Sequence, residues 1–200
     1  MTTTYRGGRG GSGRPRRPET DAVILDATRQ LFAEMGAAGM SVEAVAARAG
    51  VGKTTIYRRW PSKDELVIAA VQDVIAPVAL PDTGEIRTDL VALASLALRF
   101  MNHSSVGAMF PRMAGEVAGR TPLGRRYVKE VIAPRRRQLR LLLAKAIERG
   151  QIRADLDVTL ITDALIGPVI LRKILGELEK TTDEDVADLV DSLMEGWRPH

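Results

Sequence analysis

Residues 47–55, ARAGVGKTT, carry the spacing of side chains that could most readily do chemistry. A small first residue and a closing Gly-Lys-Thr match a loose form of the P-loop, in which backbone N–H groups and the lysine hold the phosphates of a nucleotide. The same stretch also fits the end of one helix, a tight turn and the start of a second helix. That arrangement is a helix-turn-helix DNA-binding motif.

The flanking residues favour the DNA-binding motif. A P-loop follows a buried apolar strand, whereas the preceding SVEAVAARAG carries Glu43 and Arg48 in a helical pattern. The helix after the loop can last only about two turns before Pro61 stops it. No later stretch reads as an apolar strand ending in the aspartate that would hold magnesium. The Lys-Thr pair is therefore predicted to open a recognition helix.

Two helices are predicted to precede and support this recognition helix. The first begins at Thr20 and stops near Gly36. Its apolar face is formed at helical spacing by Ile24, Leu25, Thr28, Leu31, Phe32 and Met35. Ser41 is a good N-cap for the second helix, and Gly50 can take the positive φ that turns the chain after it.

The recognition helix itself, KTTIYRRW, would be marginal alone and is expected to be held by Ile56 and Trp60, which face inward. Its outer face is then free for the major groove, where threonine can contact a thymine methyl and arginine can pair with guanine. A fourth helix, capped by Ser62, adds a phosphate contact. The side chains expected to reach DNA are Lys53, Thr54, Thr55, Tyr57, Arg58, Arg59 and Lys63. The alternative for the two arginines is a solvated helix face.

Positive charge is concentrated in the first third of the chain. Residues 1–63 contain 11 Lys and Arg against 5 Asp and Glu, within a net charge of +4, so the rest is slightly acidic. Residues 1–19 are rich in glycine and arginine and are predicted to form a disordered basic arm. The arm either adds phosphate or minor-groove contacts or is a solubilising terminus. This balance indicates a polyanionic partner for the N-terminal part alone.

The pattern after the motif is helical throughout, which predicts an all-α fold: a helix-turn-helix DNA-binding domain at residues 20–66 and a larger helical bundle at residues 67–200. Apolar residues make up 45% of the chain and aromatic residues 4%, a balance typical of helical cores. Disturbances are expected at Pro134 and Pro168. The later helices are predicted at about 62–76, 86–102, 106–118, 122–149, 157–175 and 183–196.

Composition argues against several other classes of protein. No apolar run reaches the roughly 18 residues of a membrane span, and no secretion signal is visible, so a cytoplasmic protein without a membrane partner is expected. With no cysteine and only His103 and His200 as histidines, neither thiol chemistry nor a metal site is expected. Residues 64–200 show no nucleophile–base pair. We therefore predict no catalytic residues, no cofactor and no enzymatic activity.

The span 24–71, and above all its run AGVGKTTIYRRWPSKDEL, resembles the DNA-binding domain of the tetracycline-repressor (TetR) family of bacterial transcriptional regulators. The resemblance implies a homodimeric, all-helical repressor bound to a palindromic double-stranded DNA operator. It further implies that the domain at residues 67–200 binds a small-molecule effector and that binding releases the operator. By the same resemblance, Ser41 lies near a phosphate and Lys63 clamps the DNA backbone.

The motif departs from the family at several positions. Gly52 stands where the family often has serine, which weakens the expected side-chain cap of the recognition helix. Thr54 and Arg59 also replace the usual residues, which bears on base preference and leaves the fold unaffected.

Homodimerisation would most simply use the last two predicted helices. A recognition helix of about two turns offers too few base contacts for tight operator binding, and two joined half-sites would supply the rest. The expected interface consists of two apolar stripes, Leu160, Ala164, Gly167 and Leu171, then Val186, Leu189, Val190 and Leu193. Pro168 is expected to kink the first of these helices. The alternative is that the stripes face only the protomer's own core.

The middle segments contain soft side chains that could line an adaptable apolar pocket for the effector. The expected lining is Met101, His103, Met109, Phe110, Met113 and Ile166. Methionines at helical spacing fit a core equally well, and His103 fits an exposed loop. Residues 134–140, PRRRQLR, either attract an anionic ligand or form a solvated helix face. The identity of the effector stays open.

Two further hypotheses concern control of DNA binding. The fourth helix, starting at Ser62, is expected to contact both the DNA-binding domain and the helical bundle. It is therefore the element expected to transmit allosteric control. The alternative to an operator-specific regulator is a nonspecific or architectural DNA-binding protein driven by the arginine-rich arm. Such a protein would show steep salt dependence without sequence preference.

Overall fold

The computed structural model describes residues 18–76 and 78–197, and most of the predicted basic arm lies outside them. Every regular element in these two ranges is a helix, which confirms the all-α prediction. In chain order they are α1 (Pro18–Gly39), α2 (Val42–Ala49), α3 (Lys53–Tyr57), α4 (Lys63–Ile75), α5 (Ile86–His103), α6 (Ser105–Ala118), α7 (Pro122–Tyr127), the π-helix η1 (Val128–Ile132), α8 (Ala133–Glu148), α9 (Val158–Leu175), the 3-10 helix η2 (Leu178–Lys180) and α10 (Asp183–Trp197).

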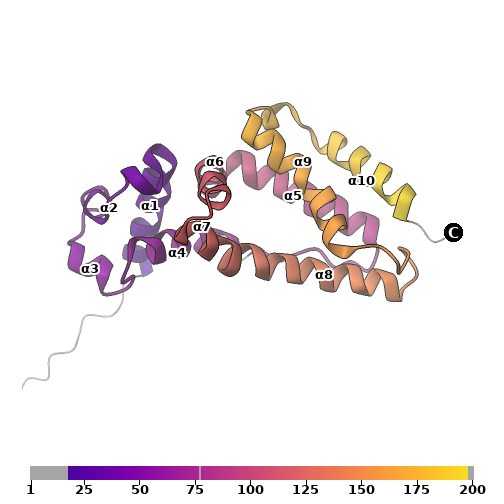
Figure 1. Ribbon diagram of the computed structural model, residues 1–200, viewed down its shortest axis with the longest axis horizontal. Coiled ribbons are helices and arrows are strands. Elements are labelled where there is room, and N and C mark those ends of the chain that lie inside the picture. Colours follow the sequence, from indigo (N-terminus) through magenta and orange to yellow (C-terminus); the bar gives the residue numbers. More distant parts are fainter. Residues whose placement is uncertain (1–17, 77, 198–200) are drawn as a thin grey trace, which may run out of the picture.

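The helices form an elongated molecule with two parts (Figure 1). Helices α1–α4 form an N-terminal unit at one end, and α5–α10 form the body. Long helix α8 runs along one side of the body, while α5, α9 and α10 lie on the other.

Local signals set the boundaries of the helices in the N-terminal unit. Ser41 caps α2 by accepting a hydrogen bond from the backbone N–H of Ala44 at 3.1 Å, and Gly50 ends that helix at φ 66°. Gly36 takes φ 69° and breaks the regular path of α1 shortly before its end. Helix α4 begins after Ser62, whose Oγ accepts from Glu65 N at 3.2 Å. These caps and turns confirm the predictions made from the same residues.

Helix α3 is shorter than predicted. It has 5 residues and ends at Tyr57, and the chain turns through Arg58 and Arg59 to Trp60. Ile56 is fully buried and Trp60 packs partly buried against the same core, as the inward-facing pair predicted. Packing of this pair, more than helix length, therefore holds α3 in place.

The two prolines predicted to disturb the body helices behave differently. Pro134 has no N–H to donate to the carbonyl of Glu130, and the helix widens into η1 immediately before it. The Glu130 carbonyl instead accepts a hydrogen bond from Nε2 of Gln72 in α4, at 3.2 Å. Helix α9 continues through Pro168 as a single element.

Buried apolar residues form two clusters. The N-terminal core fills the space between α1 and α4 and extends into α6, α7 and η1; it includes Ile24, Phe32, Ile56, Leu66, Met109, Met113 and Tyr127. The body core lies among α5, α8, α9 and α10 and includes Leu90, Leu143, Leu165, Val190 and Trp197. Because α6 and α7 contribute to the N-terminal core, the two parts of the molecule share packed helices and are not joined by a linker alone.

Candidate DNA-binding face and effector cavity

Helix α3 presents a polar face on the N-terminal unit. Lys53, Thr54, Tyr57 and Arg58 are exposed, and Thr55 is partly exposed, while Ile56 anchors the opposite face in the core. Apart from Arg59, the predicted set from the recognition helix is thus brought together on one outward surface. Hydroxyl, phenol, ammonium and guanidinium groups in this arrangement can donate to phosphates and to base edges in the major groove.

The cation at the start of α3 is held by an ion pair. Nζ of Lys53 lies 2.8 Å from Oε1 of Glu43 in α2, and both side chains are about half exposed. The hydrogen bond between them raises the pKa of Lys53 and lowers the pKa of Glu43. Exposed pairs of this kind are weak, so a DNA phosphate can replace the carboxylate as the partner of Lys53.

Three other residues predicted to contact DNA also make contacts within the fold. Nε of Arg59 lies 2.6 Å from Oδ1 of Asp21 in α1, and the Arg59 side chain is only 16% exposed. Nζ of Lys63 donates to the carbonyls of Ala37 and Met40 at 2.5 and 3.3 Å, across the connection between α1 and α2. Ser41 uses its oxygen as the cap of α2, and a hydrogen bond from its hydroxyl helps to lower the pKa of Glu43. Arg59 and Lys63 therefore stabilise the helix-turn-helix unit.

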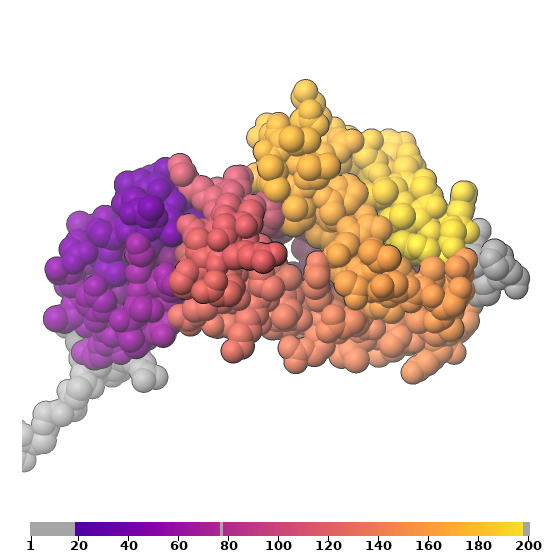
Figure 2. Space-filling view, viewed as in Figure 1, coloured from indigo at the N-terminus to yellow at the C-terminus, as the bar shows by residue number. Residues whose placement is uncertain are grey.

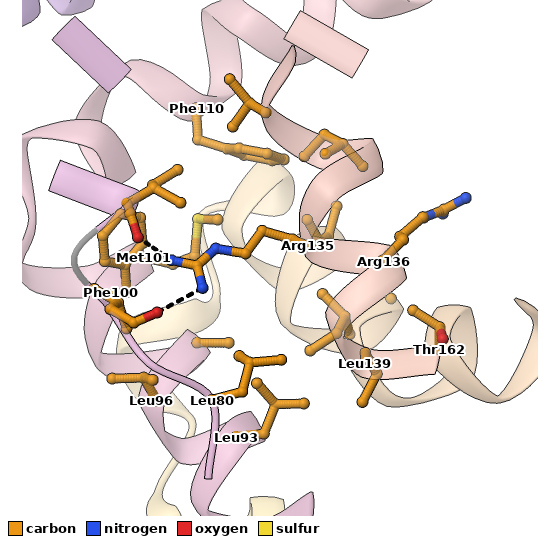
Figure 3. A pocket seen from close by; sticks show the side chains of 18 of the residues that line it. Leu80, Leu93, Leu96, Phe100, Met101, Phe110, Arg135, Arg136, Leu139 and Thr162 are labelled. Atoms are coloured by element: carbon orange, nitrogen blue, oxygen red, sulfur yellow. Dashed lines mark hydrogen bonds between the residues drawn. The ribbon is translucent and has the colours of Figure 1, made fainter. Parts of the chain in front are cut away.

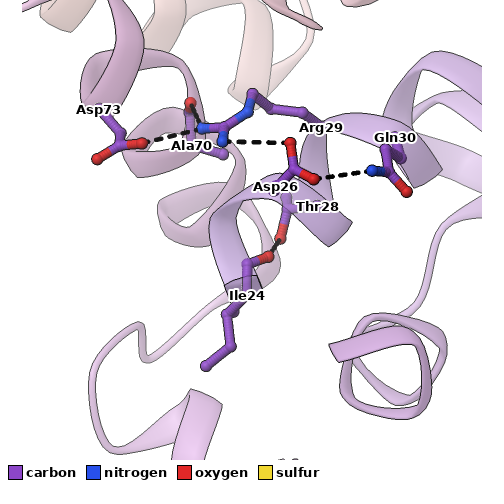
Figure 4. A network of polar contacts seen from close by, with 7 residues as sticks. All are labelled: Ile24, Asp26, Thr28, Arg29, Gln30, Ala70 and Asp73. Carbon is purple, nitrogen blue, oxygen red and sulfur yellow. Dashed lines mark hydrogen bonds and ion pairs between the residues drawn. The ribbon is translucent and has the colours of Figure 1, made fainter. Parts of the chain in front are cut away.

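Helix α4 is tied to α1 by a buried arginine (Figure 4). Nη1 of Arg29, a residue only 7% exposed, donates to the carbonyl of Ala70 at 2.9 Å and to Asp73 at 3.1 Å. Asp26 lies 3.4 Å from its other Nη. These contacts hold α4 against α1.

A cavity of about 420 Å³ lies where the two cores meet. Figure 2 shows the face of the molecule hollowed between the coral-coloured α7–α8 region and the orange α9. Its walls are almost wholly apolar and come from both parts of the molecule, for example Ile75, Leu93, Phe100, Met101, Phe110, Leu139 and Ile166. The volume is within the range of small-molecule sites, roughly 300–1,000 Å³.

Of the predicted pocket residues, Met101, Phe110 and Ile166 line this cavity. Met109 and Met113 lie instead in the N-terminal core, at 1% and 2% exposure. His103 ends α5 at a separate polar groove shared with Arg99 and Asp183. Helical spacing of methionines does not distinguish a core face from a cavity wall, which explains the difference.

The sequence left open whether the basic run 134–140 meets an anionic ligand or solvent, and in the structure one of its arginines enters the cavity. Arg135 reaches from α8 across the cavity in Figure 3, donating through Nη1 to the carbonyl of Val78 at 2.5 Å and through Nη2 to the carbonyl of Ile75. Burial lowers the pKa of its guanidinium. A signal was available: Arg135 precedes buried Leu139 by one helical turn, so it lies on the apolar stripe of α8 and not on its solvated face.

The two stripes predicted for dimerisation differ in exposure. On α9, Leu160 and Leu171 are 66% and 56% exposed, Ala164 and Gly167 are partly exposed, and exposed Ile174 and Leu175 extend the apolar surface. On α10, Val186 and Val190 are buried in the body core, and Leu189 and Leu193 are partly buried. Of the two stripes, the one with exposed leucines is therefore that on α9.

The described residues offer neither a metal site nor a membrane span. Within residues 18–76 and 78–197 no group of His, Asp and Glu could hold a metal ion. No helix in those ranges is both long enough and apolar enough to cross a membrane.

Both parts of the chain match models of one protein family. The model described as bacterial regulatory proteins, tetR family, matches residues 24–70, and the tetracyclin repressor-like C-terminal domain matches residues 80–193.

Individual relatives cover nearly the whole chain. The HTH-type transcriptional regulator YdeS of Bacillus subtilis is 31% identical over 92% of each chain. The DNA-binding transcriptional repressor TetR of Mycobacteroides abscessus is 30% identical over 89% of this chain and 94% of its own. A crystal structure of a TetR family transcription regulator, 34% identical, superposes with a TM-score of 0.67 over 90% of this chain and all of that one.

Family, fold and motif agree with the geometry of an exposed α3 held on a helix-turn-helix unit. The names of the relatives indicate a regulator of transcription and not an enzyme. The chain belongs to the TetR family of DNA-binding transcriptional regulators.

Proposed function

We propose that the protein is a homodimeric transcriptional repressor that is released from a palindromic operator by a small-molecule effector. One observation carries the proposal: the helix that follows the recognition segment, α4, ends in the wall of the apolar cavity. A ligand in that cavity contacts the same helix that Arg29 ties to α1. The repressor of Mycobacteroides abscessus, similar over most of both chains, supports the direction of regulation.

DNA contact is assigned to the outward face of α3 and its neighbours. Thr54, Thr55 and Arg58 face base edges, while Lys53 and Tyr57 hold phosphates. Ser41 adds a phosphate contact in which a phosphate replaces Glu43 as the acceptor of its O–H. Arg59 and Lys63 contribute positive potential while they stabilise the unit.

Dimerisation is assigned to α9. A recognition helix of 5 residues reads few bases, so two protomers must share one binding event. Exposed Leu160, Leu171, Ile174 and Leu175 form the apolar surface that a partner would cover. Ala164 and Gly167 are small and lie between them, which permits close helix approach. Leu189 and Leu193 on α10 are partly exposed and are assigned to the same interface.

The test is selection of bound duplexes from a random DNA pool by the purified full-length chain at near-physiological salt, followed by sequencing. We expect an inverted repeat whose half-site spacing gives the distance between the paired recognition helices. Binding without an enriched motif would contradict the proposal and favour nonspecific binding through the basic arm.

A further inference from the structure

The wall of the cavity carries one uncompensated positive charge. Its charged residues are Arg135, Arg136 and Asp163. Arg136 pairs with Asp163 and points away from the cavity in Figure 3. Tyr127 is neutral, because burial raises its pKa to about 12. The net charge of the lining is therefore that of the Arg135 guanidinium.

Arg135 has no carboxylate partner among the described residues. Its acceptors are neutral: the carbonyls of Ile75 and Val78, and Oε1 of Gln138 at 3.2 Å. A guanidinium has five N–H donors, so donors remain for a ligand. A partly buried cation with neutral acceptors gains more from a bound anion than a solvated cation does, because the surroundings screen the attraction less.

The remaining lining restricts the body of the ligand. Thr162 is one of the few other polar residues, and its hydroxyl already donates to the carbonyl of Val158 at 2.8 Å. Phe100, Phe110, Leu93 and Leu139 offer only apolar contact. A ligand with several polar groups would lose their hydration without replacement.

We propose that the effector is an amphipathic anion, with an apolar body in the cavity and a single carboxylate or comparable anionic group on Arg135. This inference rests on the proposed function, since it names the ligand class of the proposed effector cavity. The same contact would give Arg135 a regulatory role. Arg135 holds two carbonyls at and just beyond the end of α4. An anion bound by its remaining donors draws the guanidinium away from these carbonyls, so binding loosens the last turn of α4.

Calorimetric titration of the full-length protein without DNA tests the ligand class. The probes are straight-chain alkanoates from hexanoate to dodecanoate, each compared with the primary alcohol and the primary amine of equal length. We expect the best alkanoate to bind about tenfold or more tightly than its alcohol, with the amine weakest. Equal affinity for carboxylate and alcohol, or no saturable binding of any alkanoate, would overturn the proposal. This comparison needs no variant.

Two variants then assign the charge to its residue. Arg135→Gln should lower the carboxylate-to-alcohol affinity ratio about tenfold and leave alcohol affinity within about twofold. Arg137→Gln makes the same change at an exposed position on α8 and should preserve the ratio. A ratio preserved in Arg135→Gln would show that another group reads the anion.

Hydrogen exchange tests the loosening of α4. The amides of residues 72–76 should exchange faster with alkanoate bound and not with alcohol bound; unchanged protection would refute the regulatory part. All three experiments are independent of the operator. If the protein discriminates alkanoates but selects no DNA sequence, the proposed repressor function is wrong and this inference stands. If it selects an operator but does not discriminate alkanoates, the proposed function stands and this inference is wrong.

Discussion

The cations that face the two candidate sites, one on the N-terminal unit and one in the body, lie in opposite surroundings. In the N-terminal unit, Lys53 and Arg48 lie at the surface in ion pairs with exposed carboxylates. In the body, Arg135 points into an apolar cavity and bonds to neutral carbonyls. A surface pair is weak and exchanges its partner for a phosphate, whereas a partly buried cation favours a specific anion. The N-terminal unit is thus suited to a polyanion such as DNA, and the cavity of the body is suited to a small anion.

Helix α4 connects the N-terminal unit to the cavity. Arg29 holds it from α1, Gln72 bonds it to η1, and Arg135 bonds to its last carbonyl. The cavity takes its walls from both cores, so a ligand there contacts residues that stabilise each part.

The largest expected effect comes from substitutions that remove one buried side chain from each of the two cores. Ile56→Ala and Leu143→Ala each remove a fully buried side chain, one from each core, and each should lower the free energy of unfolding by about 2–5 kcal/mol. Only Ile56→Ala should also weaken DNA binding well below its melting temperature, because it undocks α3. Thermal unfolding and fluorescence anisotropy measure the two effects. Equal loss of DNA affinity in both variants would contradict the separation.

The next effect concerns the exposed surface of α9. Leu171→Asp should weaken dimerisation by about 1.5–3 kcal/mol, the worth of burying one leucine. Leu141→Asp alters a leucine that is 61% exposed on α8 and should leave the dimer intact. Sedimentation equilibrium distinguishes them. A monomeric wild type, or a dimer insensitive to both substitutions, would move the interface elsewhere.

Base reading by α3 gives a comparable or smaller effect. Arg58→Ala should weaken operator binding by about 1–3 kcal/mol and relax the preference at one base pair of each half-site. Arg140→Ala, at an exposed position on α8, is the matched control and should change little. Anisotropy titrations with operator variants provide the measurement. Uniform weakening on every sequence would instead assign Arg58 to a phosphate.

The smallest effect tests the exchange of surface partners. Glu43→Gln frees Lys53 and should tighten DNA binding about two- to fivefold at low salt, with the gain lost as salt rises. Asp82→Asn frees Lys145 on the body in the same way and should leave DNA affinity unchanged. No gain in Glu43→Gln would mean that Lys53 does not reach a phosphate.

Features encoded by neighbouring residues could be predicted from the sequence. The caps at Ser41 and Ser62 and the turn at Gly50 depend on side chains and backbone within a few positions. The inward pair Ile56 and Trp60 follows from helical spacing. These local signals placed the helix-turn-helix and most helix boundaries.

Features that depend on distant residues could not be predicted. Lys63 bonds to carbonyls 26 and 23 positions earlier, which no local pattern reveals. Whether Met109 lines a core or a cavity depends on how α6 is oriented against α1. Arg135 was assigned with its basic neighbours to either an anionic ligand or solvent, and only the packing of α8 shows that it enters the cavity.

Reciprocal linkage tests the connection through α4 most directly. If cavity and operator are coupled, an alkanoate must bind operator-bound protein more weakly than free protein, by the same factor by which it weakens operator binding. Calorimetry of the alkanoate against both forms measures this factor, which we expect to be about tenfold or more. Equal alkanoate affinity for the free and operator-bound protein would show that α4 does not couple the two sites.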